Sequence, residues 1–150
     1  DKLVNEFESR EFGREVKLRV LVIELVVEFL RWEQRKGLNP ASTDLAGDWK
    51  VVGSTLEYFR TKYAEPVYAQ DLAQAVGVSE SRLKASFKSA LGLPWSKYLQ
   101  IYRIHRAVVL LSASHCTVSE AAFAVGFESL SHFNTVFRSI MGRPPSEYVK

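Results

Sequence analysis

Side chains that could catalyse a reaction or bind a metal are few in this sequence, and they are scattered. The chain of 150 residues has three His and one Cys, namely His105, His115, Cys116 and His132. None of them follows the spacing of a metal site, and the adjacent His115 and Cys116 point in two directions from one loop. The sequence also has no glycine-rich loop that could cradle a phosphate. We therefore expect no catalytic residue, no metal and no cofactor, and we interpret Cys116 as a loop or packed thiol.

Basic side chains are the second group with chemistry to offer, and they are unevenly distributed. Residues 1–66 hold 11 Lys and Arg against 12 Asp and Glu, a net charge of −1, whereas residues 67–150 hold 9 against 5, a net charge of +4. Alone, this excess is weak evidence for a surface that binds a polyanion, and a solvated surface explains it better. The positions of the basic residues must decide between the two.

The composition excludes several classes of protein. With 47% hydrophobic and 25% charged residues the chain is globular, and disorder is excluded. The longest apolar stretch, residues 18–32, contains four charged residues, so we expect no membrane span. The single Cys cannot form an internal disulfide and no signal peptide opens the chain, so we expect the cytoplasm. Because the chain begins at Asp1, we expect it to be part of a longer protein.

The second half of the sequence contains an internal repeat. Residues 71–77 recur 49 positions later and residues 87–98 recur 50 positions later, so the second copy has one inserted residue. The matching pairs include Ala73 and Ala122, Val76 and Val125, Gly77 and Gly126, Phe87 and Phe137, Lys88 and Arg138, Gly92 and Gly142, and Tyr98 and Tyr148. So many matches in register predict two copies of one supersecondary unit.

Each copy has the pattern of a helix, a tight turn and a second helix. In the first copy Gly77 can end one helix and Ser79 can cap the next. The second helices bury an apolar stripe and expose a largely polar face. The exposed residues are Ser81, Arg82, Lys84, Ala85 and Lys88 in the first copy, and Leu130, Ser131, His132, Asn134, Thr135 and Arg138 in the second. We predict helix-turn-helix pairs at about 69–92 and 117–142, each presenting its polar face to a DNA major groove.

A helix over residues 94–112 is predicted to join the two pairs. Its inward residues are expected to be Tyr98, Ile101, Tyr102, Val108, Val109 and Leu111. Arg103 and Arg106 are expected to lie outside. About 19 residues at about 1.5 Å each span about 28 Å, comparable to the roughly 34 Å of one DNA turn. The two pairs could then read successive grooves on one face of a duplex.

The first third of the chain predicts a separate element. Residues 14–35 carry two apolar stripes at helical spacing on roughly opposite sides, so this helix must be covered twice. One stripe is Val20, Ile23, Val27 and Leu30. The cover could be an upstream region, the downstream domain or the same helix of another subunit, as in a homodimer. Residues 37–50 are rich in turn formers, and we expect a linker there. Helical periodicity resumes at Val52 and stops before Pro66.

These motifs resemble the DNA-binding domain of the AraC/XylS family of bacterial transcription regulators. The resemblance covers residues 51–150 and is carried by DLAQAVGVSESRLKASFKSALG, PWSKYLQIYRIHRAVVLL and TVSEAAFAVGFESLSHFNTVFRSIMGRPPSEY. It implies an all-α fold with two helix-turn-helix subdomains joined by a linker helix, preceded by the amphipathic helix. Residues 1–36 resemble, more loosely, the helical end of the regulatory domain in this family, where helices often pair subunits.

The resemblance also implies roles for individual residues. Base contacts fall to Ser81, Arg82, Lys84 and Ala85 and to Leu130, Ser131, Asn134 and Thr135. Phosphate contacts fall to Lys88, Arg103, Arg106, His132 and Arg138. At Ala85 and Leu130 the contact can only be apolar, as with a thymine methyl group.

We therefore expect sequence-specific binding to double-stranded DNA in transcription regulation, as an activator that contacts RNA polymerase. The alternative is a helical protein-interaction module whose DNA-binding surface is degenerate. An enzyme is the third class considered, and the scattered His and Cys residues argue against it. Salt-dependent binding to duplex DNA distinguishes the first class from the other two.

Overall fold

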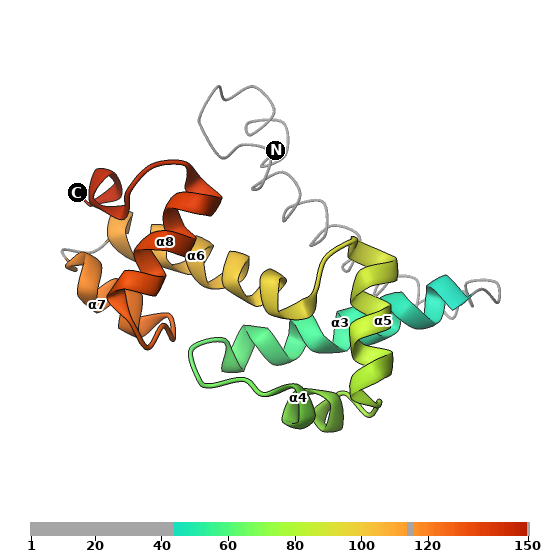
Figure 1. The fold of residues 1–150 in the computed structure, drawn as a ribbon. Coiled ribbons are helices and arrows are strands. Elements are labelled where there is room, and N and C mark those ends of the chain that lie inside the picture. The colour runs from blue at the N-terminus through green and yellow to red at the C-terminus, as the bar shows by residue number, and fades with distance from the viewer. Residues whose placement is uncertain (1–43, 114–115, 150) are drawn as a thin grey trace.

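The computed structural model describes residues 44–113 and 116–149, and every regular element among them is helical. The elements are α3 (Asp44–Lys62), α4 (Ala69–Ala75), α5 (Glu80–Leu91), α6 (Trp95–Ala113), α7 (Val118–Ala124), α8 (Leu130–Met141) and the short 3₁₀ helix η1 (Pro145–Tyr148) (Figure 1). The predicted all-α class is confirmed. The predicted helix of residues 14–35, its stripe of Val20, Ile23, Val27 and Leu30, and His115 lie outside the described residues.

The predicted elements agree closely with the observed ones, except at the start of α3. Both helix-turn-helix pairs and the joining helix begin and end within about two residues of the prediction. However, residues 44–50, which composition predicts as linker, form the first turns of α3. Local turn propensity is a weak preference that tertiary packing overrides. Here α3 packs against α5, and its residues Asp48, Val51 and Val52 are buried.

Each helix-turn-helix pair is backed by a long helix. The helix α3 packs against α4 and α5, and α6 packs against α7 and α8. Figure 1 shows these two units side by side, with α6 running from the first into the second. None of the helices that the structure describes is both long and apolar enough to cross a membrane.

Two apolar cores lie inside the two units, and α6 contributes to both. The first core is formed by Val51, Val52, Leu56, Phe59, Leu72, Ala73, Leu83, Phe87, Tyr98 and Leu99. The second is formed by Ile104, Ala107, Leu111, Ala121, Ala122, Val125, Phe127, Phe133, Val136, Phe137, Ile140 and Met141. Tyr63, just after α3, packs against both cores. The two units are therefore joined by side-chain packing as well as by the chain.

The repeat seen in the sequence is also a repeat of contacts. Phe87 and Tyr98 meet edge to face with ring centroids 6.2 Å apart, and the equivalent Phe137 and Tyr148 do the same at 5.3 Å. One predicted core residue is wrong: Val109 is 54% exposed. At about 100° per residue Val109 lies about 160° around the helix from the buried Leu111, so the two side chains cannot both face the core.

Candidate nucleic-acid interface

The second helix of each pair, α5 or α8, is called a recognition helix below, and both begin and end in the same way. The hydroxyl of Ser79 accepts a hydrogen bond from the backbone N–H of Arg82 at 3.2 Å, and that of Ser129 accepts one from His132 at 3.4 Å. At the other end Gly92 and Gly142 adopt left-handed backbone angles, with φ of 70° and 71°. These caps satisfy terminal backbone groups and fix the helix ends.

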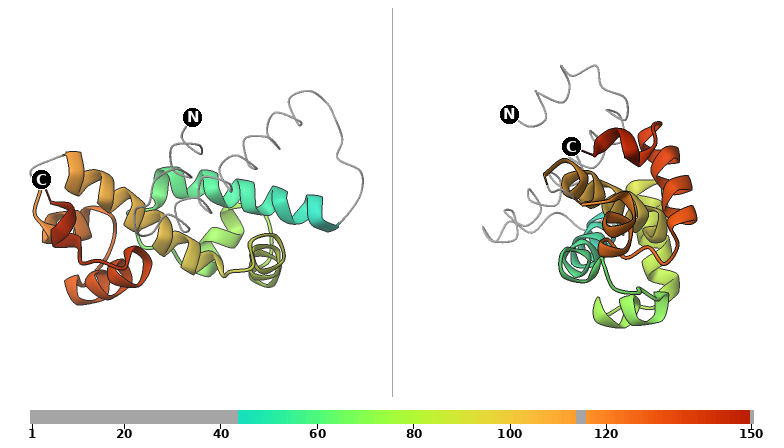
Figure 2. Two further views of the ribbon diagram at one scale, coloured as in Figure 1. Left: turned by 90° about the horizontal axis from the view of Figure 1, so that it is seen from above. Right: turned by 90° about the vertical axis from the view of Figure 1, so that its left-hand side faces the viewer.

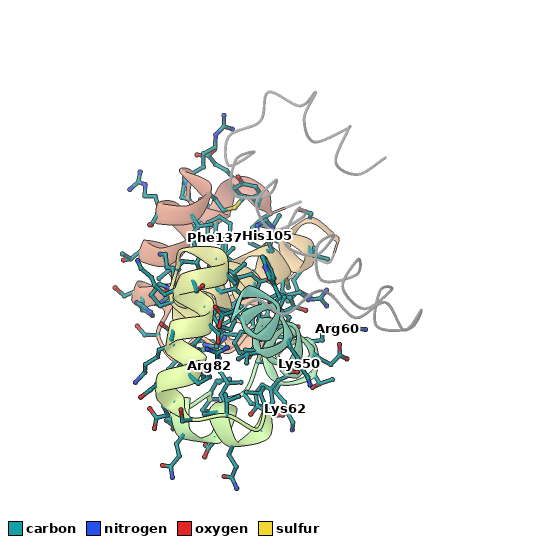
Figure 3. The ribbon with its side chains drawn as sticks, turned by 90° about the vertical axis from the view of Figure 1, so that its right-hand side faces the viewer. Lys50, Arg60, Lys62, Arg82, His105 and Phe137 are labelled. Atoms are coloured by element: carbon teal, nitrogen blue, oxygen red, sulfur yellow. The ribbon has the colours of Figure 1, made fainter. Side chains whose placement is uncertain are left out.

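Both recognition helices lie on one side of the molecule. Figure 2 (right) and Figure 3 view the molecule from opposite ends, and in both views α5 and α8 run along the same edge with α3 and α6 behind them. A surface that approaches this edge can contact both helices at once. This is the arrangement that the repeat predicts.

Four of the predicted contact residues on α5 form one open face. Ser81, Lys84, Ala85 and Lys88 are all exposed. Lys84 forms an ion pair with Glu80 at 3.3 Å, but both side chains are well exposed, and such a pair is easily exchanged for another partner. Lys84 can therefore turn to a ligand.

Arg82 lies elsewhere on the same helix. Its Nη2 atom is 3.0 Å from the Oδ1 atom of Asp48 on α3, and the side chain is 41% exposed. Figure 3 shows Arg82 on the side of α5 that faces α3. The sequence groups Arg82 with the base-reading residues, whereas the structure engages its guanidinium in an ion pair within the protein.

Asp48 is the buried partner of this pair. Its carboxylate also accepts a hydrogen bond of 2.8 Å from the hydroxyl of Ser86, in the middle of α5. Hydrogen bonds from Ser89 and Ser86 and the charge of Arg82 hold the pKa of Asp48 below its ordinary value, against the opposing effect of burial. Sequence reasoning missed Asp48, although Arg82, Ser86 and Ser89 are spaced as one polar stripe along α5 that calls for a polar partner.

The exposed face of α8 carries all the residues predicted for it. Leu130, Ser131, His132, Asn134, Thr135 and Arg138 are exposed. The hydroxyl of Thr135 donates to the backbone carbonyl of Ser131 at 3.0 Å, so it offers a ligand its acceptor lone pair and its methyl group. The ring of His132 packs against Phe127, with centroids 5.7 Å apart.

A surface hollow of about 490 Å³ borders this face. It lies between α8, the start of α7 and the start of η1. Its lining residues are Val118, Leu130, Asn134, Thr135, Arg138, Pro144, Pro145 and Ser146. The lining combines apolar groups with one cation, Arg138.

Two arginines on α6 contact the residues just beyond the C-terminal end of α3. Arg103 donates from Nε to the carbonyl of Tyr63 at 2.7 Å and from Nη2 to the carbonyl of Glu65 at 2.8 Å. Its guanidinium also lies 6.0 Å from the centre of the Phe127 ring, and burial lowers its pKa, partly offset by the charge of Glu128. Arg106 is exposed and contacts Tyr63, with Nε 3.5 Å from the hydroxyl. The sequence predicts both as phosphate contacts and does not predict the packing role of Arg103.

The turn of the second pair touches the same end of α3. Gly126 has a φ of +88°, and a Cβ atom built on it would lie 2.5 Å from the carbonyl oxygen of Ala64. Only glycine fits both the left-handed backbone and this close approach. Gly126, Arg103, Tyr63, Ala64 and Glu65 thus form one contact region between the two units, called the junction below.

Comparison with known proteins agrees with this architecture. A family model described as a helix-turn-helix domain matches residues 72–150, more than half of the chain. An AraC-like transcription regulator of Streptomyces lividans is 31% identical over 131 residues, which is 87% of this chain and 43% of the relative. The chain belongs to the AraC family of DNA-binding transcription regulators. The proteins of this family are transcription regulators and not enzymes.

Solved structures of AraC-type proteins share the fold. An AraC-type DNA-binding domain protein from Chromobacterium violaceum has a TM-score of 0.64 and 31% identity, over 69% of this chain and 92% of that one. The DNA-binding domain of AdpA, a global transcriptional factor solved in complex with a target DNA, has a TM-score of 0.59 and 26% identity, over 63% of this chain and 85% of that one. The chain spans 43% and 33% of the lengths of relatives from Streptomyces lividans and Bacillus subtilis.

Proposed function

We propose that this chain binds double-stranded DNA sequence-specifically through α5 and α8, which enter successive major grooves. The observation that carries the proposal is the presence of two equivalently capped helices, with open and largely polar faces, on one side of a single packed module. The 19 residues of α6 that join the two units span about 28 Å at about 1.5 Å per residue. That length is comparable to one turn of duplex DNA, about 34 Å.

Within this proposal the exposed residues divide into two kinds of contact. Base edges are contacted by Ser81, Lys84 and Ala85 of α5 and by Leu130, Ser131, Asn134 and Thr135 of α8. Phosphates are contacted by Lys88, Arg106, His132 and Arg138. Ala85 and Leu130 offer thymine an apolar contact, whereas Asn134 can pair with adenine and Lys84 with guanine. Arg103 is not included, because two of its N–H groups already bind carbonyls of the junction.

The test is selection of binding sites from random duplexes, followed by titration of two variants. Lys84→Ala should relax the preference at one position, where a lysine contact to guanine discriminates by about 1 to 3 kcal/mol. Arg138→Ala should weaken binding to all duplexes alike and lower the slope of log K against log salt by about one. Arg60→Ala is the matched control, because Arg60 is exposed on the side opposite α5 and its removal changes the net charge equally (Figure 3).

The outcome separates the two functions considered. A wild-type chain without salt-dependent affinity for any duplex refutes the proposal and favours a protein-interaction module. Exchanged behaviour of Lys84→Ala and Arg138→Ala would leave DNA binding intact and reverse the two assigned roles.

We further propose that binding regulates transcription in a bacterial cytoplasm and activates it through contact with RNA polymerase. The support is membership of a family of transcription regulators. Transcription in vitro from a promoter carrying the selected site, with purified RNA polymerase, tests the direction. A fall in transcript on adding the chain would show repression instead.

A further inference from the structure

Three polar residues of α5 form a stripe that faces α3 rather than the open face. Arg82, Ser86 and Ser89 follow one another at spacings of four and three. Arg82 and Ser86 both bind the Asp48 carboxylate, at 3.0 and 2.8 Å. At about 100° per residue Arg82 lies about 110° around the helix from the middle of the face formed by Ser81, Lys84, Ala85 and Lys88. The ion pair therefore holds Arg82 at the edge of the proposed DNA-contacting face.

The backbone of α3 is shaped to receive this guanidinium. Gly47 lies one residue before Asp48, and a Cβ atom at Gly47 would be 3.0 Å from the Nη2 atom of Arg82. Glycine inside a helix is unfavourable, but its missing side chain here makes room for Arg82 beside the carboxylate. A buried carboxylate is costly to leave without a cation, so Asp48 competes with DNA for Arg82.

We infer that Asp48 is a specificity-determining residue: it retains Arg82 against α3, so that α5 reads bases through Ser81, Lys84 and Ala85 and not through Arg82. This inference rests on the proposed DNA binding. An arginine is the side chain best suited to pair with guanine, so its retention removes a guanine contact that α5 would otherwise make. The pair also neutralises a carboxylate that would repel phosphates.

The arrangement has a rival with the opposite consequence. A carboxylate can also orient an arginine towards a base, in which case Arg82 would read guanine with Asp48 behind it. The two arrangements differ in what happens when Arg82 is removed. If Asp48 retains Arg82 against α3, Arg82→Ala keeps every base preference. If Asp48 orients Arg82 towards a base, Arg82→Ala loses the preference for guanine at one position.

The experiment compares wild type, Arg82→Ala, Asp48→Asn and the double variant by selection from random duplexes and by titration of the selected site. Arg82→Ala should keep the wild-type consensus and bind the selected site within about threefold of wild type. Asp48→Asn should bind all duplexes about threefold to tenfold more tightly, with a salt slope steeper by about one, and should gain a guanine preference at one position. Both gains should disappear in the double variant.

Two results would overturn the inference. One is the loss of a base preference in Arg82→Ala, and the other is an unchanged consensus in a folded Asp48→Asn. Circular dichroism and thermal unfolding establish folding. Should either single variant not fold, the double variant decides, because it leaves no unpaired buried charge and, like Arg82→Ala, should keep the wild-type consensus. If the wild-type chain binds no duplex, the proposed function fails instead, and the variants play no part in that conclusion.

Discussion

Replacing Gly126 by alanine should destabilise the protein much more than the same change at Gly77, its equivalent in the first copy. Both glycines have left-handed backbone angles, with φ of +88° and +74°. They differ in surroundings: a Cβ atom at Gly77 meets nothing within 4 Å, whereas one at Gly126 would lie 2.5, 2.8 and 2.9 Å from three backbone atoms of Ala64. The pair of variants therefore isolates the contact from the backbone strain.

The expected magnitudes follow from these two contributions. A left-handed alanine costs about 1 to 2 kcal/mol, and the lower entropy of the unfolded alanine chain returns about 0.4 to 1 kcal/mol. Gly77→Ala should therefore cost about 1 kcal/mol. Gly126→Ala should cost a further 1 to 3 kcal/mol, typical of overpacking, because the backbone at Ala64 must move. That movement also strains the bonds from Arg103 to the carbonyls on either side.

Urea denaturation gives the free energy of unfolding, and binding to a duplex with both half-sites gives the functional effect. We expect Gly126→Ala to lose affinity for the bipartite duplex as well, because the contact holds the second unit against the first. Equal losses of stability in the two variants would refute the reasoning, because the backbone at Ala64 would then move aside without a loss of free energy.

Four further substitutions test other contacts of the chain. Arg103→Ala should lower the free energy of unfolding by about 1 to 3 kcal/mol, because two carbonyls lose a charged donor, and Arg103→Lys should recover only part of it, as measured by urea denaturation. Tyr68→Thr should raise the free energy of unfolding by about 0.5 to 1 kcal/mol, because Tyr68 is the N-cap residue of α4 and its side chain makes no capping hydrogen bond; an unchanged value would show that threonine forms no cap there. The stability that Asp48 contributes should be complete above pH of about 4 and lost as the pH falls through its lowered folded pKa, so the difference in unfolding free energy between wild type and Asp48→Asn should narrow from pH 5 to pH 3. Val27→Asp should shift the chain towards monomer in sedimentation if its stripe pairs subunits; a wild type that is monomeric at micromolar concentration would exclude pairing.

The elements that were predictable from the sequence are those specified by local patterns. The turn glycines Gly77 and Gly126 and the apolar stripes of the second helices recur in both copies, which supported each assignment, and the structure confirms Ser79 as the cap of α5. The sequence analysis did not name the equivalent cap of α8, Ser129. The open faces of α5 and α8 followed from the same periodicity, because a buried stripe determines which side of a helix stays exposed.

The contacts between distant segments were not predictable. Asp48 and Ser86 are 38 residues apart, and Arg103 and Tyr63 are 40 apart. Neither sequence separation carries a periodicity, and Asp48 lies in a stretch whose glycines and polar residues resemble a linker. Arg103 and Arg106 look alike in the sequence as basic residues on one helix, and only the packing shows that the first is engaged by backbone carbonyls.

Contacts between distant segments also mean that two copies of one motif need not contact DNA in the same way. Behind α5, the supporting helix α3 contributes a buried carboxylate that engages one of the basic residues of α5. Behind α8, the residues that the supporting helix α6 contributes to the second core are the apolar Ile104, Ala107 and Leu111, which offer no charge to the side chains of α8. Divergence in the supporting helix can thus change what a recognition helix presents without any change in the residues that face the groove. If Asp48 retains Arg82 as inferred above, the sequence specificity of the proposed DNA binding depends on α3 as well as on α5 and α8.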